Sequence, residues 1–244
     1  MKCLAFIVVL AALPASAKDP EPAPDIPPTV YRGEYVDIDV SGLKEGDWSE
    51  YETADTNAAP KAKKPTMRLA CVKVEPELAW VELTRGNDSE LREGRVLVLA
   101  LRKTDSQVAQ AFYGKPGEAA QTLKVVEGGA RGEMPSAIPA VVEGSGKTSK
   151  EKFKAGTLSL DCEKIETDLT TTTGCCANRR RTAYLVSEKV AFAPRFPEGA
   201  GITWESKPTG KAGLVRRVID IEGHKIIMTL LRFGTDAKQT LSVK

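Results

Sequence analysis

Histidine and aromatic residues are scarce in this chain of 244 residues. Phe, Trp and Tyr make up 6% of the sequence, and there is one histidine. A Ser-His-Asp or Cys-His site needs its histidine held beside the nucleophile, whereas His224 directly follows a turn sequence, Glu222-Gly223. A glycosidase needs two carboxylates at a defined separation, and this chain has few aromatic platforms for a sugar. We therefore expect no enzymatic activity.

An excess of charge of one sign is also lacking. Lys and Arg number 35 and Asp and Glu number 33, so the formal net charge is +2. Nucleic-acid binding depends on a basic surface that neutralises phosphates, and we expect none here.

Motifs for cofactors and metals are likewise missing. The C-x-x-C and H-x-x-x-H spacings of zinc sites do not occur. Segment 144–148 (Gly-Ser-Gly-Lys-Thr) looks briefly like a phosphate-binding loop, but Val141 stands where that motif needs its first glycine. We expect no cofactor and no metal, and interpret the segment as part of a flexible loop.

One apolar run stands out, at residues 4–13. It follows Lys2 and precedes the small residues Ala-Ser-Ala at 15–17, the order typical of a secretory signal peptide. A membrane-spanning helix needs about 20 apolar residues, so we predict cleavage after residue 17 and no transmembrane segment in the mature chain. Lys18, where a lipoprotein has its cysteine, indicates an unanchored periplasmic or secreted protein.

Four cysteines remain after residue 17: Cys71, Cys162, Cys175 and Cys176. An even number in an oxidising compartment favours disulfides, and the sequence leaves the pairing open. Cys175 and Cys176 are adjacent and followed by three arginines at 179–181. The alternative is a soft-metal or redox site there, since neighbouring cations acidify thiols.

The chain reads as one β-rich domain behind a leader. Residues 18–29 contain five prolines, which predicts an extended, proline-rich leader at 18–40. Residues 41–244 then form a single domain, with a flexible loop at about 127–152 where Gly, Pro, Ser and Lys gather.

Alternating and apolar segments predict a mainly β fold. Residues 67–74 and 78–83 alternate around a turn, and 95–101 are continuously apolar, as in a strand buried on both faces. Residues 214–221 and 225–233 flank Glu-Gly-His, which predicts a hairpin. We expect a single curved antiparallel sheet or half-barrel of about eight to eleven strands, with few short helices.

Large apolar side chains on these segments are the candidates for ligand contact. Trp48, Trp80 and Trp204 each lie in or beside an expected strand, and Phe233 ends the C-terminal hairpin. Packing in the core or at the sheet edge is the ordinary role of such residues. The alternative is that they line an apolar ligand cavity.

Three short segments together resemble uncharacterised bacterial exported proteins: Gly46-Asp47-Trp48-Ser49-Glu50-Tyr51, Phe153-Lys154-Ala155-Gly156-Thr157-Leu158, and Trp204-Glu205-Ser206 with Pro208 and Gly213-Leu214-Val215. Those proteins are similar to the half-barrel carriers of the LolA, LolB and LppX type. The resemblance covers about residues 44–243 and implies a curved sheet that carries an apolar molecule or lipid on its concave face. Leu158 stands where the family has an aromatic residue, and the Cys175-Cys176 segment is not part of the shared pattern.

Two functions remain open alongside a weaker third. The first is an exported, non-enzymatic protein that binds an apolar molecule or an envelope protein on its concave face, which predicts a continuous apolar cavity or groove. The second is a structural or interaction module of the cell envelope, which predicts an exposed apolar patch or a long unpaired sheet edge. The third is an envelope enzyme or a redox or metal protein, which needs a cleft with convergent polar groups.

Overall fold

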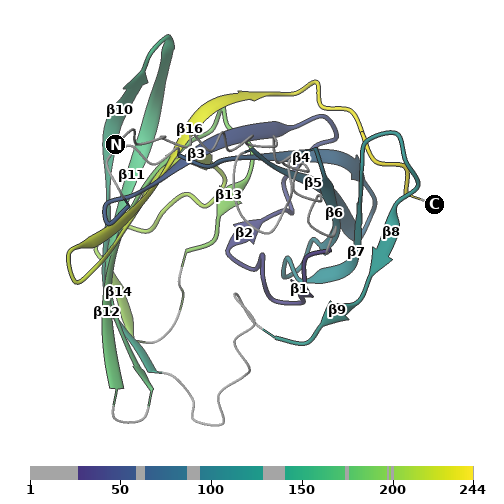
Figure 1. Ribbon diagram of the computed structural model, residues 1–244. Coiled ribbons are helices and arrows are strands. Elements are labelled where there is room, and N and C mark those ends of the chain that lie inside the picture. Colours follow the sequence, from purple (N-terminus) through teal and green to yellow (C-terminus); the bar gives the residue numbers. More distant parts are fainter. Residues whose placement is uncertain are drawn as a thin grey trace, which may run out of the picture.

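The fold is a large curved β-sheet, which Figure 1 shows as a computed structural model. The structure describes residues 27–58, 64–86, 94–128, 141–173, 176–196, 198 and 201–243. These residues contain sixteen strands and no helix, so the mainly β prediction is confirmed and the expected short helices are not found among them. It follows that no helix of the described ranges could cross a membrane.

Twelve strands form the main sheet, in the order β14-β10-β11-β12-β15-β16-β3-β4-β5-β6-β7-β8. The sequence-based estimate of eight to eleven strands was therefore too low. The bounds of these strands are β3 (Trp48–Asp55), β4 (Thr66–Val74), β5 (Leu78–Gly86), β6 (Val96–Arg102), β7 (Val108–Gly114), β8 (Gln121–Leu123), β10 (Val141–Ala155), β11 (Leu158–Thr173), β12 (Cys176–Ser187), β14 (Ile202–Trp204), β15 (Gly213–Ile221) and β16 (His224–Gly234). Every neighbouring pair is antiparallel except β10 and β14.

Two short ribbons complete the fold. The strands β1 (Val30–Tyr31) and β9 (Val125–Val126) pair in parallel, and β2 (Ile38–Asp39) pairs antiparallel with β13 (Ala193–Pro194). In Figure 1 the main sheet curls round and β2 and β13 lie within its curve. We call the sheet face toward this ribbon the inner face and the opposite one the outer face.

The inner face carries the main core, because alternate residues of each strand meet across the ladder. Leu69 of β4 pairs with Leu83 of β5, which pairs with Leu97 of β6, and all three are buried in one cluster. Burying each leucine stabilises the fold by about 1.5–3 kcal/mol.

The outer face of the same strands is covered by the C-terminal strap, residues 235–243. Val96, Val98 and Phe112 of the outer face form a buried cluster with Leu241 of this strap. Because strap and inner core cover opposite faces, the continuously apolar β6 is buried on both sides, as its sequence predicted.

A buried carboxylate holds the strap in place. Glu82 of β5 is 3% exposed, and its carboxylate accepts hydrogen bonds from the Thr240 N–H (2.7 Å), the Thr240 hydroxyl (2.8 Å) and the Leu241 N–H (3.1 Å). Three donors offset the cost of burying this charge.

The C-terminal hairpin forms as expected. Strands β15 and β16 pair from Arg216–Thr229 to Ile221–His224. Glu222 and Gly223 both have positive φ, 53° and 89°. This is the conformation of a two-residue turn whose twist matches that of its strands.

Two predicted boundaries were wrong. Residues 141–152 of the expected flexible loop belong to β10, which pairs with β11 over its whole length. Its side chains are mostly exposed, so this strand has the Gly, Ser and Lys composition of a loop and no apolar run that would mark it as a strand. The leader also ends earlier than residue 40, because Val30 and Val40 are buried in the main core. The remaining leader residues, 18–26, and loop residues 129–140 lie outside the described residues.

Candidate functional site

Two hollows lie on the inner side of the sheet, on either side of the β2–β13 ribbon. Ile38 of β2 lines the first hollow, of about 170 Å³, which we call the inner cavity. Its neighbour Asp39 lines the second, of about 780 Å³, which we call the outer cleft because it lies beyond the ribbon, although it too is on the inner side of the sheet. Pro194 of β13 lines both. Because successive residues of a strand point to opposite sides, a ribbon two residues long separates an apolar space from a polar one.

The inner cavity has a mostly apolar lining. The sheet contributes Tyr51, Met67, Leu69, Leu214, Arg217 and Met228, and the covering segments contribute Glu34, Tyr35, Asp37, Ile38, Phe192 and Pro194. Methionine is unbranched and adaptable, so Met67 and Met228 can repack around a bound group.

Phe192 of the cavity wall has a strained backbone. Its φ is 63°, in the left-handed region that a bulky residue rarely adopts, and its side chain is 4% exposed. Such a conformation costs about 1–3 kcal/mol and tends to occur at binding sites. Two hydrogen bonds secure this segment: the Leu214 N–H donates to the Phe192 carbonyl (3.2 Å) and the Gly213 N–H to the Val190 carbonyl (3.0 Å).

Tyr51 supplies a polar group at the sheet side of this cavity. Its hydroxyl donates to the Leu214 carbonyl at 3.1 Å. Burial raises the pKa of Tyr51 well above its ordinary value, against a smaller opposing effect of Ser49 and Arg217. The phenol therefore stays neutral and structural, and it cannot serve as a base near neutral pH.

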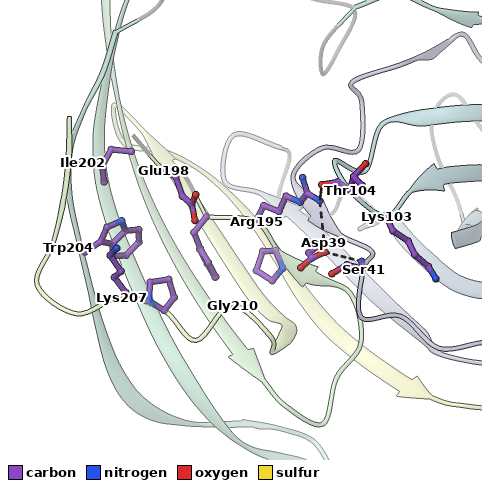
Figure 2. A pocket seen from close by; sticks show the side chains of 13 residues that line it. Asp39, Ser41, Lys103, Thr104, Arg195, Glu198, Ile202, Trp204, Lys207 and Gly210 are labelled. Atoms are coloured by element: carbon purple, nitrogen blue, oxygen red, sulfur yellow. Dashed lines mark hydrogen bonds and ion pairs between the residues drawn. The ribbon is translucent and has the colours of Figure 1, made fainter. Parts of the chain in front are cut away.

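The outer cleft lies between β14 and the loops around Asp39 and Thr104 (Figure 2). Trp204 and Ile202 of β14 form one wall, and Phe196, Pro194 and Pro208 add apolar surface. Phe196 packs edge-on against Tyr184 of β12, with ring centroids 5.2 Å apart.

Gly146 explains the position of Trp204. The two residues pair in the parallel ladder, and a Cβ on Gly146 would lie under 3.0 Å from three indole carbons. A glycine in β10 thus lets the ring pack flat on the strand. The sequence offered this glycine as part of a loop, so its role was missed.

The opposite wall of the cleft is a small polar network. The Asp39 carboxylate accepts the Ser41 N–H at 2.9 Å and lies 4.0 Å from the Arg195 guanidinium. Arg195 also donates to the Thr104 carbonyl at 3.3 Å. Figure 2 shows these groups facing Trp204 across the cleft.

The four predicted ligand-binding residues do not come together. Trp204 lines the outer cleft. Phe233 packs against the inner core but lines neither hollow. Trp48 and Trp80 lie on the outer face with Ala237 of the strap, and the Trp48 N–H donates to Asp236 at 2.7 Å.

The predicted disulfide is not formed by the cysteines that the structure describes. Cys71 and Cys162 are free, buried thiols on strands five positions apart in the sheet order. Burial raises the pKa of Cys71 to about 12 and also raises that of Cys162. Cys175 and the Cys176 side chain, and with them the redox or metal alternative, lie outside the described residues.

The one histidine lies far along the hairpin from both hollows. His224 contacts Asp55 at 2.7 Å beside the β15–β16 turn, and neither residue lines the cavity or the cleft. Among the described residues, no three His, Cys, Asp or Glu side chains are grouped as a metal site requires.

Comparison with known proteins yields solved structures alone. No family model matches the chain, and no curated protein matches it. A protein with a YmcC-like fold from Bacteroides fragilis is 8% identical, with a TM-score of 0.34 over 85% of this chain and 99% of that one. A DUF1329 family protein from Desulfovibrio piger is 10% identical, with a TM-score of 0.34 over 81% of this chain and 88% of that one.

Proposed function

We propose that this protein is exported from a bacterial cell and binds a small apolar group, without catalysis, in the inner cavity. The observation that carries the proposal is the apolar hollow between the inner face and the β2–β13 ribbon, lined by Met67, Met228 and Phe192. Apolar pockets with a few placed polar groups are the usual form of small-molecule sites.

The size of the cavity limits the ligand. An apolar cavity of about 150 Å³ in another protein accommodates benzene, and the cavity here measures about 170 Å³. One ring or the end of one hydrocarbon chain therefore fits, and a whole multi-chain lipid does not. This ligand is smaller than those that the resemblance to half-barrel carriers implies.

The strain at Phe192 supports a binding role over simple packing. A fold under selection for stability alone would place glycine or asparagine at a φ of 63°. Keeping a phenylalanine there retains a large apolar side chain in the cavity wall at a cost of about 1–3 kcal/mol.

Export and the absence of catalysis are parts of the same proposal. Export is supported by the basic, apolar and small-residue order of residues 2–17. A non-catalytic role is supported by the location of His224 away from both hollows and by the raised pKa of the buried Cys71 thiol. Neither group is placed to act as a nucleophile or base there.

Native mass spectrometry of protein purified from its own cells tests this proposal. We expect an added mass of an apolar molecule on the wild type, and its loss from a Met67→Phe/Met228→Phe variant with a smaller cavity. Leu231→Phe, at a position of β16 that is 40% exposed, is the matched control and should retain the mass. Equal occupancy of all three proteins would contradict the proposal.

One observation favours the alternative of an interaction module. Among the described residues, the edge of β10 that faces away from β11 is paired with β14 over Gly144–Gly146 alone, which leaves the rest of β10 as a long unpaired sheet edge. However, lysines stand at 147, 150, 152 and 154 of this strand, and charged edges oppose pairing with another strand. If β10 instead docks an acidic partner through these lysines, charge reversal at Lys150 and Lys152 should abolish recovery of a crosslinked partner.

A further inference from the structure

The outer cleft is a second site whose chemistry differs from that of the inner cavity. Its volume of about 780 Å³ falls in the range of about 300–1,000 Å³ that small-molecule sites occupy. Its lining places aromatic and proline rings opposite a network of charged and hydroxyl groups. A pure hydrocarbon would displace water from those polar groups and replace none of its hydrogen bonds, so the cleft fits a ligand with both C–H and hydroxyl surfaces.

Trp204 supplies the apolar platform of this cleft. Gly146 fixes one side of the indole ring against β10, and the ring lines the cleft. The Trp204 N–H makes no hydrogen bond with any described residue, and it is not buried. It is thus an accessible donor beside an aromatic surface.

The opposite wall supplies paired acceptors and donors. The Asp39 carboxylate is held by the Ser41 N–H, and the Arg195 guanidinium by the Thr104 carbonyl. Because both groups are fixed by the backbone, they can bind adjacent hydroxyls of one ligand with little loss of side-chain freedom.

The lining of the outer cleft also carries an excess of positive charge. Lys103 and Lys207 line the cleft, and neither forms an ion pair within the part of the chain that the structure describes. The two carboxylates of the lining are Asp39, which faces Arg195, and Glu198. Three cations against two carboxylates favour a ligand that carries a negative charge.

We propose that the outer cleft binds an acidic saccharide. One C–H face of a sugar ring would stack on Trp204, its hydroxyls would bind Asp39 and Arg195, and its carboxylate would lie near Lys103 or Lys207. The proposal uses residues other than those that carry the inner cavity, so either can fail without the other.

Titration with trigalacturonate, followed by tryptophan fluorescence and calorimetry, tests the site. We expect saturable binding that weakens at least tenfold in Trp204→Phe and is unchanged in Trp48→Phe, which alters an outer-face tryptophan. Thermal unfolding of each variant checks that the fold is retained. Unchanged binding by Trp204→Phe, or no binding by the wild type, would overturn the proposal.

A second comparison tests the acidic character of the ligand. Lys103→Gln/Lys207→Gln should bind trigalacturonate at least tenfold more weakly at low salt, while Lys115→Gln, an exposed position outside the cleft, should bind as the wild type does. Added salt should weaken wild-type binding. Equal affinity for neutral maltotriose would overturn the acidic assignment. Met228→Phe should leave this binding intact, which separates the site from the inner cavity.

Discussion

The indole ring of Trp204 occupies the space that a side chain at Gly146 would need. A Cβ at residue 146 would lie under 3.0 Å from three ring carbons. The two strands that carry these residues, β14 and β10, run parallel at the edge of the sheet. The wall of the outer cleft therefore depends on the absence of one side chain.

Gly146→Ala should displace the indole and distort this edge. We expect a loss of about 1–3 kcal/mol in the free energy of unfolding, as for other overpacked sites, and a changed Trp fluorescence spectrum. Urea denaturation measures the first effect. Gly42→Ala is the control, because a Cβ at Gly42 meets nothing within 4 Å; its free energy should change by less than about 0.5 kcal/mol. Equal stability of the two variants would contradict the packing described.

Glu82→Ala should loosen the C-terminal strap. The substitution leaves the N–H groups of Thr240 and Leu241 and the Thr240 hydroxyl without their acceptor. We expect a loss of about 2–4 kcal/mol in the free energy of unfolding. Hydrogen exchange should also become faster at residues 237–243.

The matched controls for Glu82 separate its charge from its hydrogen bonds. Glu82→Gln keeps one acceptor oxygen and should lose less stability than Glu82→Ala. Glu118→Ala, at an exposed position, should change the free energy of unfolding by less than about 0.5 kcal/mol. If Glu82→Ala behaves like Glu118→Ala, Glu82 does not hold the strap.

Asp168 should contribute stability that depends on pH. Hydrogen bonds from Arg179 and Arg181 lower its pKa to about 2, compared with about 3.9 in an unfolded chain. A lowered folded-state pKa means that the contribution is complete above about pH 3.9 and is lost as the pH falls through about 2. Its side chain is 33% exposed, so we expect less than about 1 kcal/mol.

Urea unfolding of wild type and Asp168→Asn at pH 6 and pH 2 measures this contribution. The difference in free energy of unfolding should shrink at the lower pH. Asp161→Asn, on the same strand with a side chain 84% exposed, should show little difference at either pH. A gap between wild type and Asp168→Asn that grows on acidification would contradict the assignment.

Cys71 and Cys162 should resist alkylation in the folded protein. Both thiols are buried, and the pKa of Cys71 is raised to about 12, so little reactive thiolate exists at pH 8. Iodoacetamide followed by peptide mass spectrometry should label them in urea and leave them unlabelled in buffer. A disulfide-linked peptide containing either residue, or rapid labelling without urea, would show that the free, buried state is wrong.

Strands with an apolar pattern could be predicted from the sequence, and those without one could not. Residues 95–101 indicated a doubly buried strand, which is β6. The Glu222-Gly223 turn marked the β15–β16 hairpin, since both residues adopt positive φ. In contrast, β10 lies close to the edge of the sheet. Its backbone pairs with β11, while its exposed Lys, Ser and Gly residues bury little apolar surface and give no apolar pattern.

The inner cavity and the outer cleft depend on contacts between distant segments, and sequence reasoning found one residue of the cleft and none of the cavity. Trp204 was chosen as a large apolar group, and it lines the outer cleft. Trp48 and Trp80 are equally large and apolar, but they face the strap. Which alternate residues of a strand point to the inner face depends on how the whole sheet curves, and the sequence of one strand does not show it. The β2–β13 ribbon joins residues 38–39 to 193–194, a pairing for which neither segment carries a local signal.

Methyl NMR of protein labelled with [¹³C-methyl]methionine is the most direct test of the central claim, that the inner cavity binds an apolar group. With benzene as the probe, the Met67 and Met228 resonances should shift saturably in the wild type and in the control Leu231→Phe. In Met228→Phe the Met67 shift should disappear, because the added ring reduces the cavity. If neither resonance moves up to the solubility limit of benzene, or if Met67 shifts equally in Met228→Phe, the inner cavity is not a ligand site.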